Sequence, residues 1–418
     1  MKKMLIILSS NKMGYLIIFI IFLLFLSCRV ISSPEGFSFR IRLEFDFPIP
    51  TAKSVEGYDI IEIEGLDSYG KPGEPVIPFK TIKVLLPYDE RLENIEIIPK
   101  DKTFLEGKYY LKPGQTLYPT SYNATIEFTP PNNTIYDSVN PFPSKFYSKA
   151  PIQELRGYKI LILNLYPVQY IPKTGQVYYF KSMEVKVLTK SVTKPLTKKA
   201  IQKINFRGLP KDEERVRSVV DNPEMIESYN ELNAQITKLN KYYSSVILPL
   251  SGVNSSESYE YVIITNSTLN SSFQKLIDWK KTRPVNPINT TIVLVENITD
   301  DPDYWCDGSW GDGCGSGAQF NDTQAMIRNF IKDAYNNWGI EYVLLGGDVE
   351  IIPHRGVYVY SGSYTDYDIP CDMYYGTLNG SWDSDNDNIF GEASPEEADF
   401  FAEVYIGRAT VASTSEAE

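Results

Sequence analysis

Residues 341–348, Glu-Tyr-Val-Leu-Leu-Gly-Gly-Asp, decide the fold of the C-terminal part of the chain. A short continuous apolar run of this kind is typical of a strand that is buried on both faces, as in parallel sheets. Asp348 follows the strand at its carboxyl end, where open α/β sheets bind ligands. Gly346 and Gly347 would let the backbone turn there without a side chain blocking approach. A carboxylate that only caps the next turn is an equally good interpretation of Asp348.

The segments on either side of this strand alternate between strand and helix patterns. The predicted elements are a strand at 261–265, a helix through 273–279, a strand at 291–295, a helix capped by Asp322, and a strand within 400–408. Apolar strands joined by helical crossovers predict a mostly parallel sheet with helices on both faces.

The last residues have the spacing of a helix capping box, with Ser413 at the cap and Glu416 three positions later. The sequence ends at Glu418, before such a helix has a body. We therefore expect residues 257–418 to be an α/β domain truncated at its C-terminal side.

The front of the chain has a different pattern. From Phe37 to Phe47 apolar and polar residues alternate strictly, which predicts a half-buried strand. Further strand patterns occur at 58–64, 81–86, 158–165 and 177–187, separated by turn residues. Residues 34–189 are thus predicted to form one all-β domain, a sandwich or a barrel. Residues 190–256, rich in Lys, Glu, Asn and Ser, are expected to be a linker with a candidate processing site among its basic residues.

The first residues predict export. Lysines precede the apolar run 15–26, which is shorter than the roughly 20 residues that a spanning helix needs, so residues 1–28 read as a secretory signal rather than an anchor. Sequons for N-glycosylation, some of them accidental, agree with a secreted or cell-surface glycoprotein. They begin at Asn123, Asn132, Asn254, Asn266, Asn270, Asn289, Asn297, Asn321 and Asn379.

Cysteine usage fits an oxidising compartment. Cys306 and Cys314 flank a short glycine-rich loop that a disulfide closes easily, with a metal knuckle as the weaker alternative. Cys371 is left over. His354 is the single histidine of the chain, and nothing in the spacing supports a nucleophile–base pair between it and Cys371.

The chain has a formal net charge of −12, and its charged residues are distributed unevenly along the sequence. From residue 300 onward there are 23 acidic residues against four basic ones, which argues against nucleic acid as a partner of this part. The acidic part is expected to bind cations, and the slightly basic front to dock on it.

Residues 382–392 carry the strongest local motif. Asp383, Asp385 and Asp387 follow the start of a calcium loop, Asn388 suits a left-handed turn, and Glu392 could close the ligand shell. A solvated acidic turn is the alternative. We favour Ca²⁺ because three neighbouring carboxylates repel one another.

Five motifs in order resemble the gingipain family of cysteine peptidases. They are 273–280 (FQKLIDWK), 341–348 (EYVLLGGD), 351–353, 372–376 (DMYYG) and 403–408 (EVYIGR). The resemblance implies the first half of a caspase-like α/β catalytic domain. The β-rich front, with Gly73-Glu74-Pro75-Val76-Ile77-Pro78, looks like the family's propeptide, which docks on the catalytic domain.

The resemblance also implies the chemistry. The family's catalytic histidine and cysteine lie in motifs after the I-G-R strand, so no catalytic role passes to His354 or Cys371. The family's calcium ligands correspond to Asp348 and to the loop of Asp383–Asp387. We therefore expect the secreted precursor fragment of a cysteine endopeptidase that acts on proteins or peptides. The alternative is a non-catalytic, exported, calcium-binding surface protein with the same fold.

Overall fold

The computed structural model describes most of the chain after the predicted signal. The described residues are 39–118, 126–192, 206–236 except 235, 257–305, 322–361, 364–392 except 381, 384 and 386, and 400–417. The signal prediction for 1–28 and the disulfide prediction for Cys306 and Cys314 lie outside these residues.

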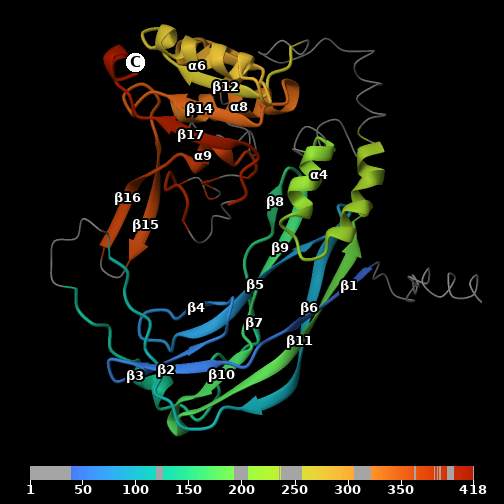
Figure 1. Ribbon diagram of the computed structural model, residues 1–418, viewed down its shortest axis with the longest axis vertical. Helices are drawn as coiled ribbons and strands as arrows, with labels where there is room; N and C mark the ends of the chain where they lie inside the picture. The colour runs from blue at the N-terminus through green and yellow to red at the C-terminus, as the bar shows by residue number, and fades with distance from the viewer. Residues whose placement is uncertain are drawn as a thin grey trace, which may run out of the picture.

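The N-terminal β domain consists of antiparallel strands (Figure 1). One sheet has the order β1-β11-β10, with β6 also paired to β11, and the other has the order β4-β5-β9-β7, with β8 on β9. Strands β2 and β3 form a separate pair. The strands are β1 (Phe39–Asp46), β2 (Thr51–Val55), β3 (Tyr58–Glu62), β4 (Asp67–Tyr69), β5 (Ile77–Leu85), β6 (Glu90–Phe104), β7 (Tyr147–Lys149), β8 (Gln153–Leu155), β9 (Tyr158–Leu165), β10 (Val168–Ile171) and β11 (Gln176–Ser191).

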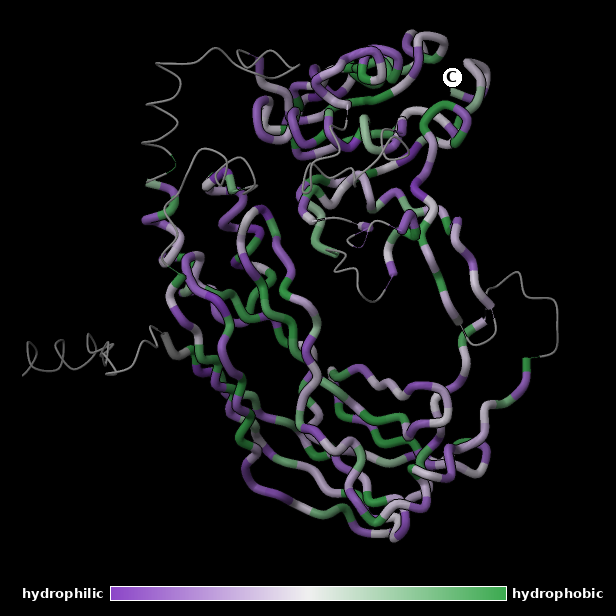
Figure 2. The backbone as a smooth tube through the Cα atoms, turned by 180° about the vertical axis from the view of Figure 1, so that it is seen from behind, coloured by the Kyte–Doolittle hydropathy of each residue, from purple (hydrophilic) through white to green (hydrophobic). Residues whose placement is uncertain are grey.

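Alternation of side chains explains these strands. Along β11 buried and half-buried positions alternate from Met183 to Thr189, and β9 follows a similar pattern with one interruption at Ile160 and Leu161. Residues of both sheets share one hydrophobic core. Figure 2 shows the hydrophobic positions gathered along the strands. The short elements α2 (Asn133–Tyr136) and η1 (Pro172–Thr174) lie between strands. The prediction of a strand-rich front is confirmed.

The segment after β11 differs from the expected loose linker. Its described part contains α4 (Pro210–Arg217) and η2 (Pro223–Tyr229). Phe206, Val216 and Tyr229 are buried in the core of the N-terminal β domain, and Asn222 accepts from and donates to the backbone of Leu85. Residues 206–236 thus belong to the first domain. The sequence did not indicate this packing, because the apolar residues of the segment are isolated among many charged ones.

The C-terminal α/β domain contains a four-stranded parallel sheet with the order β13-β12-β14-β17. Its elements are β12 (Tyr261–Thr265), α6 (Asn270–Thr282), β13 (Thr290–Leu294), α7 (Val295–Thr299), η3 (Pro302–Tyr304), α8 (Thr323–Asn337), β14 (Tyr342–Gly346), β15 (Arg355–Ser361), β16 (Tyr364–Cys371), α9 (Met373–Gly376), β17 (Tyr405–Ala409) and α10 (Thr414–Ala417).

Two separate cores show that helices cover both faces of this sheet. Ile263 packs with Phe273 and Ile277 of α6. Its neighbours Val262 and Ile264 pack on the other face, with α8 residues such as Ile331. Helix α8 begins as predicted, since Asp322 accepts from the backbone N–H of Ala325 at 2.8 Å. The prediction of a parallel α/β sheet is confirmed.

The antiparallel pair β15–β16 was not predicted. It leaves the parallel sheet and points toward the N-terminal β domain (Figure 1). Further on, Ser413 precedes α10 as expected, but the Glu416 carboxylate accepts from the N–H of Ala412 at 2.7 Å instead of from the cap residue itself.

The two domains contact each other through charged side chains. Arg156 and Arg207 of the N-terminal β domain bind Glu341 of the C-terminal α/β domain. This agrees with the expectation that a basic front docks on an acidic back. Among the described residues, no helix is both long and apolar enough to cross a membrane.

Candidate functional site

The carboxyl edge of the parallel sheet is the predicted ligand edge. Strands β12, β14 and β17 end there in register, at Thr265, Gly346 and Ala409. Asp348 follows β14. Its Oδ1 accepts from the N–H of Val349 at 2.8 Å, and its carbonyl accepts from the N–H groups of the turn that follows. These contacts favour the capping interpretation of Asp348.

The two glycines before Asp348 are needed for packing. A Cβ on Gly346 would lie 2.8 Å from the ring of Phe273, and one on Gly347 would lie 2.7 Å from Ile351. Both distances are shorter than side chains tolerate. The glycines therefore allow α6 and the following loop to approach the strand, so they do not by themselves indicate a bound ligand.

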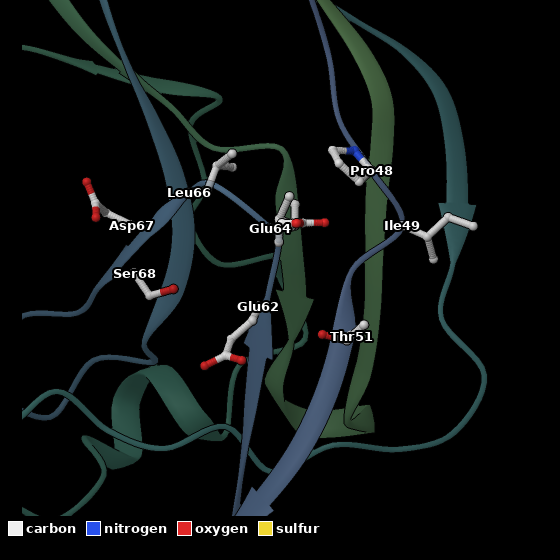
Figure 3. Close-up of a pocket in the computed structure, with 9 residues that line it drawn as sticks. Pro48, Ile49, Thr51, Glu62, Glu64, Leu66, Asp67 and Ser68 are labelled. Atoms are coloured by element: carbon white, nitrogen blue, oxygen red, sulfur yellow. The ribbon is translucent and has the colours of Figure 1, made fainter.

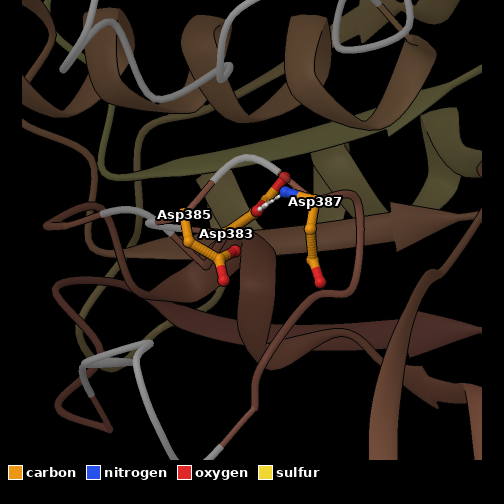
Figure 4. A group of neighbouring side chains, drawn as sticks. All are labelled: Asp383, Asp385 and Asp387. Carbon is orange, nitrogen blue, oxygen red and sulfur yellow. Dashed lines mark hydrogen bonds between the residues drawn. The ribbon is translucent and has the colours of Figure 1, made fainter.

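The acidic loop brings its three aspartates together (Figure 4). Ligand oxygens of Asp383, Asp385 and Asp387 lie within 4.8 Å of one another. Asp383 is buried and accepts from the N–H groups of Asp387 and Asn388 at 3.0 and 3.2 Å. Asn388 takes the left-handed conformation expected of it, with φ +71°. The loop thus has the carboxylate donors that Ca²⁺ prefers.

The other two predicted ligands are not in this cluster. In the described part of the chain, the group of close acidic side chains contains Asp383, Asp385 and Asp387, without Glu392 or Asp348. Three carboxylates supply fewer oxygens than the six to eight that Ca²⁺ takes. Backbone carbonyls and waters would have to provide the rest.

His354 and Cys371 do not form a catalytic pair. His354 Nε2 lies 3.1 Å from Asp368 Oδ1 of β16, and in the described part of the chain no hydrogen bond joins the ring to Cys371. Cys371 is a half-buried free thiol at the end of β16, opposite Arg355. Burial raises its pKa, which disfavours the thiolate that a nucleophile requires.

Two arginine–carboxylate pairs that the sequence did not reveal fix this edge. Arg408 of β17 binds Asp372 through two contacts of 2.7 Å and also donates to the carbonyls of Gly347 and Ile352. Arg355 binds the α8 cap Asp322 through two contacts of 2.8 Å. Arg408 is the last residue of the 403–408 motif and Arg355 belongs to none of the motifs, so only the fold shows the partners of both.

The described residues leave two relevant hollows. One of about 390 Å³ at the carboxyl edge is lined by His354, Arg355 and Asp368, among others. Another of about 600 Å³ lies in the N-terminal β domain, where Glu62, Glu64 and Asp67 line it (Figure 3). Neither contains an assembled nucleophile and base.

Two family models match the chain. The propeptide model of peptidase family C25 matches residues 29–216, and the model of peptidase family C25 itself matches residues 254–418. Together they cover most of the chain, in the order of a precursor. The chain belongs to the gingipain family of cysteine peptidases, as its motifs predicted.

Solved structures give weaker similarity. A complex of Porphyromonas gingivalis RgpB pro- and mature domains is 16% identical, with 47% of this chain and 97% of that chain covered and a TM-score of 0.35. A structure on the zymogenic latency of gingipain K, also from Porphyromonas gingivalis, is 18% identical, with 39% and 98% covered and a TM-score of 0.33. No curated protein matches the chain.

Proposed function

We propose that the chain is the secreted precursor of a gingipain-like cysteine endopeptidase. The supporting observation is that a propeptide match over residues 29–216 is followed by a peptidase match over residues 254–418 in one chain. The complete enzyme would hydrolyse peptide bonds of protein or peptide substrates through a thiolate activated by histidine. The predicted signal and sequons support export to the cell exterior or surface.

The catalytic histidine and cysteine of this proposal are those of the family motifs, which His354 and Cys371 do not match. The raised pKa of Cys371 and the pairing of His354 with Asp368 support leaving both residues out.

Residues 1–418 should therefore show no thiol-dependent peptidase activity. The test assays the chain and its Cys371→Ala variant on peptide substrates, before and after a thiol reagent. Activity that the thiol reagent abolishes and that Cys371→Ala also abolishes would make Cys371 the nucleophile and overturn the assignment. Inactivity in both agrees with it, and the complete coding sequence then supplies the positive control.

We further propose a structural calcium ion at the acidic loop, held by Asp383, Asp385 and Asp387. The close approach of their oxygens supports it. Asp348 and Glu392 remain predictions for the same or a neighbouring site.

Calcium at 100 times its Kd should stabilise the protein by about 2.7 kcal/mol. We expect the Tm to rise by about 5 °C or more in calcium relative to chelator. Asp385→Asn should reduce this shift, and Asp303→Asn, which changes an exposed aspartate outside the cluster, should keep it. Equal melting temperatures of the wild type in calcium and chelator would leave the loop an ordinary solvated turn.

The same loop favours the second candidate, a non-catalytic, exported, calcium-binding surface protein. Reading the coding sequence past Glu418 separates the two candidates. A Gly-His-Gly motif and a downstream cysteine support the peptidase, whereas a true stop codon at that point supports the surface protein.

A further inference from the structure

Glu403 of the C-terminal α/β domain has partners in both domains. It lies shortly before β17 and is fully buried. Its Oε1 accepts from the backbone N–H of Arg156 at 3.2 Å, across the domain boundary, and from Nδ2 of Asn379 at 2.8 Å. Its Oε2 accepts from the backbone N–H of Leu378 at 2.7 Å. One carboxylate thus joins the N-terminal β domain to residues 378 and 379.

These two residues belong to a segment that leads into the acidic loop. We call residues 377–380 and 382 the stem. Arg328 of α8 donates twice to the carbonyl of Thr377, at 3.0 and 2.6 Å, and Nε1 of Trp382 donates to Oγ1 of Thr377 at 3.0 Å. The buried candidate ligand Asp383 follows Trp382 directly (Figure 4). The position of Asp383 therefore depends on how the stem is held.

On the other side of the boundary, the turn between β8 and β9 presents the N–H group of Arg156. Arg156 has φ +52° and Gly157 has φ +81°, and a positive φ is unusual for a residue with a long side chain. The guanidinium of Arg156 contacts Asp212 of its own domain and Glu341 of the α/β domain at 2.6 Å each. The turn is thus fixed by contacts with both domains while its N–H group binds Glu403.

Two further contacts hold the segment that carries Glu403 against the N-terminal β domain. The backbone N–H of Phe400 donates to Oε1 of Gln153 at 2.6 Å. Arg215 lies 5.8 Å from the ring centroid of Tyr405. Because these contacts lie on both sides of Glu403 in the sequence, the domain contact fixes the backbone from which this carboxylate extends.

Separation of the domains would change how Glu403 holds the stem. A desolvated carboxylate needs hydrogen-bond donors, and separation removes the donor that Arg156 supplies. Water would take its place and compete with Leu378 and Asn379 for the carboxylate oxygens. The stem then gains conformational freedom, and part of the binding free energy of a cation at the acidic loop is lost in ordering it again.

We propose that the contact between the two domains and the binding of Ca²⁺ by the acidic loop are coupled through Glu403, so that each strengthens the other. Such a coupling is reciprocal: the factor by which the domain contact raises the calcium affinity is also the factor by which Ca²⁺ tightens the domain contact. The inference rests on the proposed structural calcium ion and does not depend on peptidase activity.

The first test measures the Kd of the full chain for Ca²⁺ by isothermal titration calorimetry. Glu341→Gln weakens the domain contact, since Glu341 binds Arg156, Arg207 and Lys211 of the N-terminal β domain. Among the residues that the structure describes, no hydrogen bond joins Glu341 to the stem or to the acidic loop. We expect Glu341→Gln and Glu403→Gln each to raise the Kd by about fivefold or more.

Glu260→Gln is the matched control. Glu260 precedes β12 as Glu341 precedes β14, but it is exposed, so this variant should bind Ca²⁺ like the wild type. An unchanged Kd in Glu341→Gln overturns the coupling and leaves the calcium site standing. An effect of Glu403→Gln alone would make Glu403 a local support of the stem, which also overturns the coupling. A wild type that binds no Ca²⁺ overturns the calcium site itself, and the coupling with it.

A second measurement needs no variant of the buried carboxylates, which could fail to fold. Amide hydrogen exchange of the wild type is followed at Arg156 in calcium and in chelator. Ca²⁺ should slow the exchange of this N–H by about fivefold or more, and Asp385→Asn should abolish the slowing. The N–H of Tyr110, which donates to Asp59 of the same domain at 2.8 Å, is the reference and should be unaffected. Equal exchange at Arg156 in calcium and chelator, in a wild type that binds Ca²⁺, overturns the coupling.

Discussion

At the scale of single residues, the candidate site and the contact between the two domains both depend on arginine–carboxylate pairs whose partners are distant in the sequence. Arg408 and Asp372 are 36 positions apart, and Arg156 and Glu341 are 185 positions apart. Asp322 was predicted as a helix cap from local spacing, and that was correct. Its second role, as the partner of Arg355, depends on a tertiary contact that no local pattern encodes.

Glu341 should make the domain contact sensitive to acid. Burial alone would raise the pKa of this carboxyl group, but the positive charges of Arg207 and Arg156 outweigh burial and lower it. The stabilisation by Glu341 is therefore complete above the ordinary glutamate pKa of about 4.3 and is lost as the pH falls through the lowered value.

Urea unfolding between pH 7 and pH 3 measures this contribution. The difference in unfolding free energy between the wild type and Glu341→Gln should be constant from pH 7 to about pH 5 and should shrink only at lower pH. A difference that already shrinks between pH 7 and pH 6 would contradict the assignment of the charged state.

At the scale of elements, regular strands and helices were predictable and the irregular connections were not. Strand β9 was predicted with its exact bounds, and α8 with its cap. Both were predictable because burial of one or both faces of an element produces a periodic pattern of apolar residues in the sequence. The pair β15–β16 was missed. Its residues alternate poorly, and β16 is mostly exposed or half-buried, so it leaves little periodic signal.

The start of α8 offers a test that separates two roles of one side chain. Asp322→Asn keeps an acceptor for the N–H of Ala325 but removes the charge opposite Arg355. Asp322→Ala removes both. We expect Asp322→Ala to destabilise the protein by about 1 kcal/mol more than Asp322→Asn, which is the usual contribution of an N-cap.

Thermal and urea unfolding of both variants checks this order. Both should be clearly less stable than the wild type, because Arg355 is buried and loses a charged partner. Arg91→Ala, which removes an exposed pair with Glu93, is the control and should change the stability by less than about 1 kcal/mol. Equal stabilities of Asp322→Ala and Asp322→Asn would show that the cap contributes nothing.

At the scale of the whole molecule, composition predicted that the two parts meet, but not where. The surplus of acidic residues after position 300 and the basic front agree with the contacts between Arg156, Arg207 and Glu341. Which residues meet is decided by the β8–β9 turn and by α4, whose segment we had expected to be a linker. Of the predicted metal ligands, Asp383, Asp385 and Asp387 lie close together in the structure. They are near neighbours in the sequence, so their proximity requires no long-range contact.

The buried ion pairs of Arg156 and Arg207 with Asp212 and Glu341 should couple the unfolding of the two domains. A buried charge that loses its partner is costly, by roughly 3–5 kcal/mol, so neither domain can unfold without destabilising the other. Calorimetry of the wild type should show one transition. Glu341→Gln should separate it into two, whereas Glu260→Gln should not. Two well-separated transitions in the wild type would mean that the domains are thermodynamically independent.

The acidic partners of Arg156 are far apart in the sequence, and this separation sets an order of events during synthesis. Asp212 follows Arg156 after 56 residues, whereas Glu341 and Glu403 follow after 185 and 247 residues. At about 5–20 residues per second, a ribosome needs roughly 10–50 s between making Arg156 and making these acids. During that interval the nascent N-terminal β domain can form its hydrophobic core. Of the three acidic partners of Arg156, Asp212 alone has then been synthesised. The N-terminal β domain then presents an open cationic surface on which the later α/β domain assembles as it emerges.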